Sequence, residues 1–167
     1  MLPRTQRLTA LLLATCLALP LSAFAENRSR GRTSALPTDA NAIVAAMNRQ
    51  RSAHGLRPLR LDSRLSLAAR DRANDMFEKH YFNHVSPDGI DPFSWALRRG
   101  YRYSLIGENL ALGYRGSGPI VDGWMHSPGH RENILTGEFD EVGIAIGDGS
   151  PTRGYRGPLV VALYAVR

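Results

Sequence analysis

Two apolar runs near the C-terminal end constrain the fold of this chain more than any other feature. They read VGIAIG over residues 142–147 and LVVALYAV over residues 159–166, and a stretch rich in glycine and proline joins them. Short runs of this composition are typical of β-strands, and the connection favours an antiparallel hairpin. Neither run alternates cleanly between apolar and polar residues, so we expect both faces of the sheet to be covered.

The segments upstream supply helices that can cover those faces. Between Asp39 and His54 apolar residues recur at helical spacing, and Gly55 ends the pattern. A second helix is predicted after Asp62, with an apolar stripe formed by Leu65, Ala69, Ala73, Met76 and Phe77. The run SLIGENLALG over residues 104–113 predicts another strand or extended segment. We therefore predict an α+β fold, an α-β-α sandwich around a small antiparallel sheet.

Three shorter helices are predicted from their ends. Asp91-Pro92 opens one that closes at Gly100, and IVDGWM over residues 120–125 forms another. Ser127-Pro128 suits the N-cap and first position of a last helical turn that runs to Leu135.

The first residues have the three-part plan of a secretory signal. Two arginines precede an apolar run over residues 8–21, and Ala23-Phe24-Ala25 follows. We predict a signal peptide over residues 1–25, a flexible leader over 26–37 and a single domain over 38–167, exported to the periplasm or beyond. An uncleaved anchor and a lipid anchor at Cys16 are the minor alternatives, and no transmembrane segment is predicted after cleavage.

The net charge indicates only the general class of partner. Loss of the signal removes Arg4, Arg7 and Cys16, so the predicted mature chain has no cysteine and its formal charge falls from +6 to +4. A mildly basic surface suits lipid headgroups or envelope polymers. There is no basic run long enough to indicate nucleic acid, which we do not expect as a partner.

Glu108 is the residue most in need of a partner. It lies among leucines and isoleucine in LIGENLAL, where an isolated buried carboxylate would cost several kcal/mol. Histidines are the candidates, in two pairs spaced four apart: His80 with His84, and His126 with His130. A turn or helix break affects each pair, so at most one member of each is expected to face a given site. Neither pair matches the HExxH zinc motif.

Two other interpretations stay open from the residues alone. Ser127 lies between two histidines but has no G-x-S-x-G elbow, and its side chain is predicted to cap a helix. His84, Glu108 and His130 could equally form a satisfied polar cluster that holds helices to the sheet.

The motifs YFNHVSPDG, GENLAL, GWMHSPGHRENIL and FDEVGIAIGDG, in this order, resemble the bacterial branch of the CAP superfamily. This is the SCP family, which comprises cysteine-rich secretory proteins, antigen 5 and pathogenesis-related-1 proteins. The resemblance covers residues 40–166 and implies an α-β-α sandwich with an open cleft. By resemblance the cleft residues are His84, Glu108 and His130, with Asn109 and Ser127 beside them. Trp124, Arg131 and Asn133 would have structural roles.

The sequence also departs from the family. Eukaryotic members carry a second cleft glutamate three residues after the helix tryptophan, and Ser127 occupies that position here. No cofactor is required by the remaining set, although His84 and His130 could hold Zn²⁺ or another divalent metal in an open, weak site. The resemblance implies a non-enzymatic binding module for a lipid-like, small hydrophobic or envelope-derived ligand. The alternatives are a metal-assisted hydrolase with Glu108 as general base, and a purely structural or host-interaction role.

Overall fold

The computed structural model describes residues 38–167, so the predicted signal peptide, leader and Cys16 lie outside the described residues. All five predicted helices are present: α1 (Ala40–Ala53), α2 (Ser63–Glu78), α3 (Ser94–Arg98), α4 (Ser117–Met125) and α5 (Pro128–Leu135). None of the helices in residues 38–167 has the length and hydropathy needed to cross a membrane.

The sheet has four strands in the order β1-β3-β4-β2: β1 (Arg60–Leu61), β2 (Leu105–Leu112), β3 (Glu141–Gly147) and β4 (Leu159–Val166). Strand β4 pairs antiparallel with both β3 and β2, which confirms the hairpin and the strand predicted in SLIGENLALG. Strand β1 was not predicted, and it pairs parallel with β3. Two residues are too few for any periodicity to show.

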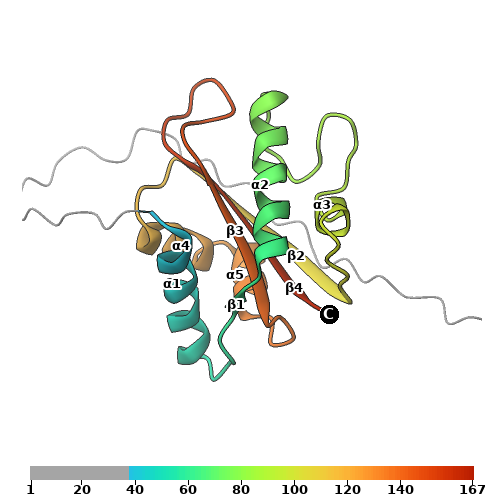
Figure 1. The fold of residues 1–167 in the computed structure, drawn as a ribbon. Helices are drawn as coiled ribbons and strands as arrows, with labels where there is room; N and C mark the ends of the chain where they lie inside the picture. The colour runs from blue at the N-terminus through green and yellow to red at the C-terminus, as the bar shows by residue number, and fades with distance from the viewer. Residues whose placement is uncertain (1–37) are drawn as a thin grey trace, which may run out of the picture.

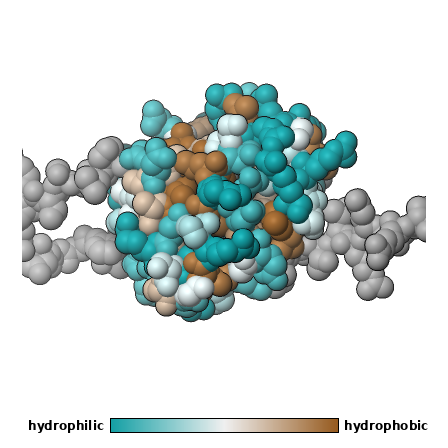
Figure 2. Space-filling model, turned by 60° about the horizontal axis from the view of Figure 1, so that its bottom comes forward, coloured by the Kyte–Doolittle hydropathy of each residue, from teal (hydrophilic) through white to brown (hydrophobic). Residues whose placement is uncertain are grey.

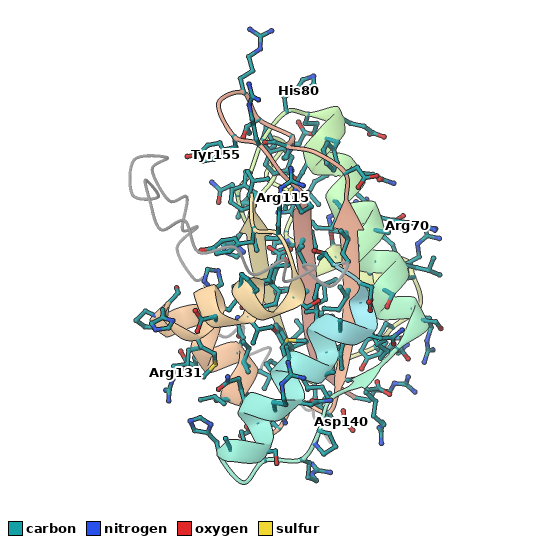
Figure 3. The ribbon with its side chains drawn as sticks, turned by 90° about the vertical axis from the view of Figure 1, so that its left-hand side faces the viewer. Arg70, His80, Arg115, Arg131, Asp140 and Tyr155 are labelled. Atoms are coloured by element: carbon teal, nitrogen blue, oxygen red, sulfur yellow. The ribbon has the colours of Figure 1, made fainter. Side chains whose placement is uncertain are left out.

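Both faces of the sheet are covered, as the apolar runs predicted. Along β4, residues 159, 161, 163 and 165 pack in a core with α2 and α3, while residues 160, 162 and 164 pack in a second core with α1, α4 and α5. Figure 1 shows α2 crossing one face of the sheet, and Figure 3 shows the strands between α2 and the helices α4 and α5. The α-β-α sandwich is confirmed.

A glycine within the β3 run sets the distance between helix and sheet. A Cβ atom at Gly143 would lie 2.1 Å from the carbonyl carbon of Leu65 and 2.4 Å from its oxygen. These are backbone atoms of α2, and a backbone cannot relieve a clash by changing rotamer as a side chain can. Gly143 therefore allows α2 to lie directly on the sheet.

Arg51 is a fully buried cation at the end of α1. Its guanidinium donates to the backbone oxygens of Arg57 (2.7 Å), Ile134 (2.9 Å), Thr136 (2.8 Å) and Phe139 (2.8 Å). Burial lowers its pKa. Arg51 thus joins the loops that follow α1 and α5, although no carboxylate is within ion-pair distance among the described residues.

Candidate functional site

The carboxylate of Glu108 lies on β2 and is only 3% exposed. Its Oε1 is 2.7 Å from Nδ1 of His84, and its Oε2 accepts a hydrogen bond of 3.1 Å from Nε of Arg72. Because a carboxylate only accepts, Nδ1 of His84 carries the ring proton. The expectation that Glu108 must be paired, and that a histidine would be one partner, is therefore confirmed.

Arg72 is the second partner, and the sequence reasoning missed it. It lies on α2 and is fully buried. Besides Glu108, its guanidinium contacts the backbone oxygens of Asn83 and His84, the latter at 2.8 Å, and the hydroxyl of Tyr81. One side chain therefore holds both the carboxylate and the segment that carries His84.

The position of Arg72 was visible in the helical pattern. It lies seven residues after Leu65, three after Ala69 and four before Met76, all of which are buried on the same helix. An arginine on an apolar stripe requires an internal partner, just as Glu108 does.

The polar network continues from Arg72 to the surface. The hydroxyl of Tyr81 also contacts Asp75, and Nζ of Lys79 bridges Asp75 and Asp88 at 2.6 Å each. Burial, followed by the hydrogen bond with Asp75, raises the pKa of Tyr81 to about 12. Lys79 thereby ties the end of α2 to the turn that follows His84.

Two buried asparagines connect β2 with α5. Nδ2 of Asn133 donates to the backbone oxygen of Glu108 (3.1 Å) and to Oδ1 of Asn109 (2.8 Å). Nδ2 of Asn109 donates to the backbone oxygen of His130 (3.0 Å) and to the hydroxyl of Tyr164 (3.1 Å). These amides fix the end of α5 that carries His130 against the strand that carries Glu108.

His130 is 2% exposed, and its Nε2 is buried without a hydrogen-bond partner. Burial, together with a smaller repulsion from His84, lowers the pKa of His130 to about 4, so the ring is neutral at pH 7. His126 is exposed instead, and its Nδ1 contacts the backbone oxygen of Asp122. The break between α4 and α5 separates the two histidines as predicted.

The other predicted residues have different surroundings. Ser127 occupies the N-cap of α5 and Pro128 its first position, as predicted, but the buried Ser127 side chain makes no capping hydrogen bond, so that part of the prediction was wrong. The backbone oxygen of Ser127 accepts from the amide of Arg131 instead. Nε1 of Trp124 donates to the backbone oxygen of Leu110 at 3.0 Å, which fixes α4 to the sheet. Arg131 does not join the buried cluster, because it is exposed and its guanidinium lies 3.3 Å from Nε2 of His54.

A divalent metal is the group that the resemblance implies here. Nδ1 of His84 is held by Glu108, a contact common among metal-binding histidines, and Nε2 of His130 has no hydrogen-bond partner. However, residues 38–167 contain no group of three histidine, cysteine or acidic side chains that could hold a metal ion. Catalytic zinc uses three protein ligands. This donor set suits at most a weakly held ion.

A four-stranded mixed sheet between two helical layers is the architecture of a CAP domain. The chain belongs to the cysteine-rich secretory protein (CAP) family, whose model matches residues 44–164. It is a bacterial-type member of this superfamily.

Relatives and solved structures agree with this assignment. The chain is 36% identical over 125 residues to the Bacillus subtilis protein YkwD, covering 75% of this chain and 49% of the relative. It is 31% identical over 110 residues to the Bacillus subtilis membrane protein YlbC, covering 65% and 32%. The matches thus span half or less of each relative.

Two solved structures share the fold. An extracellular protein containing an SCP domain from Bacillus anthracis superposes with a TM-score of 0.65 at 25% identity, covering 76% of this chain and 40% of that one. An outer surface protein from Borrelia burgdorferi gives a TM-score of 0.66 at 22% identity, covering 76% and 91%.

Proposed function

We propose that this chain is an exported binding module for a lipid-like or envelope-derived ligand, and that the ligand donates a hydrogen bond to Nε2 of His130. The unpartnered ring nitrogen is the observation that carries the proposal. A buried polar atom without a partner costs about 1–3 kcal/mol, and a ligand donor at this atom recovers that cost. The low pKa keeps the ring neutral, so one of its two nitrogens accepts a hydrogen bond, and the proposal assigns this role to Nε2. A hydroxyl or amide donor suits such an acceptor.

The surroundings of Glu108 favour binding over hydrolysis. A general base needs a carboxylate oxygen available to the attacking water. Both oxygens of Glu108 are held, by His84 and by Arg72, and removing either contact would leave a buried charge with one partner fewer. Ser127 makes no hydrogen bond to His130 that would activate it as a nucleophile.

Export and an apolar ligand have support of their own. The two solved neighbours are described as an extracellular protein and an outer surface protein, and residues 1–25 have the pattern of a secretory signal. Figure 2 shows hydrophobic side chains in the middle of one face, with hydrophilic residues between and around them. Such a patch suits a ligand with an apolar body.

The test compares two ligands that differ only in the hydrogen-bond donor. We expect 1-hexadecanol to bind about tenfold more tightly than its methyl ether, as measured by titration calorimetry, because one hydrogen bond to a buried acceptor contributes about 1.4 kcal/mol. His130→Phe should abolish this preference. His126→Phe, a change at the exposed histidine four residues earlier, should retain it.

Other outcomes would contradict the proposal. Equal affinity for the alcohol and the ether would exclude a hydrogen bond to His130, and no binding of either would reject a lipid-like ligand. Elemental analysis of the purified protein runs alongside. Stoichiometric zinc, lost in His130→Phe, would favour the metal-assisted alternative.

A further inference from the structure

A cluster of exposed arginines lies on two neighbouring loops, apart from the residues around Glu108. Arg115 belongs to the loop between β2 and α4, while Arg153 and Arg156 belong to the loop between β3 and β4. Tyr155 lies between the last two and is 39% exposed. We call these four residues the arginine patch.

Backbone contacts bring the two loops together. The amide of Gly113 donates to the backbone oxygen of Pro158 at 3.1 Å. A Cβ atom on Gly157 would lie 2.9 Å from Cα of Gly113, so the chains touch at these glycines. Arg115 follows one contact by two residues, and Arg156 directly precedes the other. Figure 3 shows Arg115 and Tyr155 in the same part of the molecule, with Arg70 on its opposite edge.

The guanidinium groups of the patch form no ion pairs with other residues in the range 38–167. Arg115, Arg153 and Arg156 are exposed, and none forms an ion pair or hydrogen bond through its guanidinium with another part of residues 38–167. By contrast, Arg60, Arg99 and Arg167 pair with carboxylates. The only acidic residue on either loop is Asp148, at the start of the second one. The patch therefore presents three cations to solvent.

We propose that the arginine patch binds an acidic polysaccharide, with the guanidinium groups on the carboxylate or phosphate groups of the polymer and the ring of Tyr155 against a sugar face. Arginine matches the geometry of both anions. Tyrosine adds an apolar ring with a polar tip.

A membrane surface fits the patch less well. Residues 148–158 read DGSPTRGYRGP and contain no leucine, isoleucine, valine, phenylalanine, methionine or tryptophan to enter a bilayer. In the loop between β2 and α4, the ring of Tyr114 packs against Gly123 of α4 and is therefore not available to a ligand. Tyr155 is then the only free aromatic residue on the two loops.

The experiment measures the binding of the purified protein to polygalacturonic acid by biolayer interferometry. The fully methyl-esterified polymer is the ligand control, because it has the same sugar backbone without the carboxylate charge. We expect R115Q/R153Q/R156Q to bind polygalacturonic acid about tenfold more weakly, at roughly twofold for each exposed contact. Y155A should weaken binding severalfold without changing the net charge. The esterified polymer should bind weakly to every variant, and added salt should weaken only the charged interaction.

The matched control removes three arginines elsewhere. R49Q/R70Q/R102Q changes the net charge equally at exposed side chains that have no ion pair within residues 38–167, and we expect less than a twofold effect. Equal weakening in both triple variants would show that net charge alone is responsible and would overturn the proposal. Binding to phosphatidylglycerol vesicles but not to the polymer, lost in the patch variant, would replace the polysaccharide with a membrane. Failure of the hexadecanol test would leave this result unaffected, because no patch residue contacts His130.

Discussion

Replacing Arg72 with methionine tests whether one buried cation holds the site together. The change keeps an unbranched chain as far as the position of Nε and removes every polar contact of the guanidinium. Glu108 then keeps only His84 as a partner for its charge, and the backbone oxygens of Asn83 and His84 lose a donor.

The expected cost follows from these contacts. Removing one partner of a buried ion pair costs about 3–5 kcal/mol, because the other charge remains buried. Two backbone oxygens without their donor add about 1 kcal/mol each. We therefore expect Arg72→Met to lower the free energy of unfolding by about 5 kcal/mol, a large part of the 5–15 kcal/mol typical of a domain.

Urea denaturation followed by circular dichroism measures this loss, and Glu108→Gln in the same background identifies its cause. With the carboxylate neutralised, we expect the double variant to regain about 2 kcal/mol relative to Arg72→Met. The control is Arg70→Met on the same helix, an exposed residue that should change stability by less than about 0.5 kcal/mol. A cost below about 1 kcal/mol for Arg72→Met, or no recovery with Glu108→Gln, would refute the reasoning.

Three further changes test other parts of the fold by the same denaturation assay. Gly143→Ala should destabilise by about 3 kcal/mol, because the new methyl group would meet the backbone of Leu65 at 2.1 Å. Arg51→Met should cost about 3–5 kcal/mol, because a set of backbone oxygens loses a shared donor. His130 has a pKa of 6.5 in the unfolded chain and about 4 in the folded protein, so the unfolded chain binds a proton first as the pH falls. The contribution of His130 to the free energy of unfolding should therefore be fully present only above pH 6.5. Its contribution, about 3 kcal/mol, should fall as the pH drops between these values.

Each change has its own control. Gly118→Ala on α4, where nothing lies within 4 Å, should leave stability unchanged or slightly higher, and a similar loss in both glycine variants would exclude a specific contact. If His130→Asn loses stability with falling pH as steeply as the unmodified protein does, the dependence arises from the carboxylates. Unchanged hydrogen exchange at residues 134–139 in Arg51→Met would show that the arginine does not hold that loop.

The periodicity of the sequence predicted most of the architecture because the apolar residues are placed regularly. The covered sheet followed from the lack of alternation in LVVALYAV, and the separation of His126 from His130 followed from Ser127-Pro128. The capping contact of Ser127 failed because its side chain is buried at the junction of two helices. Hydroxyl geometry at such a junction depends on tertiary packing, which a local motif does not report.

The burial of Arg51 and Arg72 was not predicted from the sequence pattern. Arg51 lies four residues after Met47, and Arg72 four before Met76, so both occupy apolar faces of their helices. Because arginine is rarely fully buried, its place on an apolar face does not by itself predict burial. Their partners are mostly backbone oxygens of distant loops, which carry no signature in the sequence. The need of Glu108 for a partner was predictable, but the identity of the cation was not.

The strand order has a consequence for when this protein can fold. Strand β4 lies inside the sheet between β3 and β2, although residues 159–166 come last among the described elements. Without them β2 has no neighbouring strand, and the inner walls of both cores are missing. A nascent chain therefore stays open until this segment has emerged from the ribosome. Such an order of assembly would suit the export that we propose, because an exported chain crosses its translocation channel before it folds.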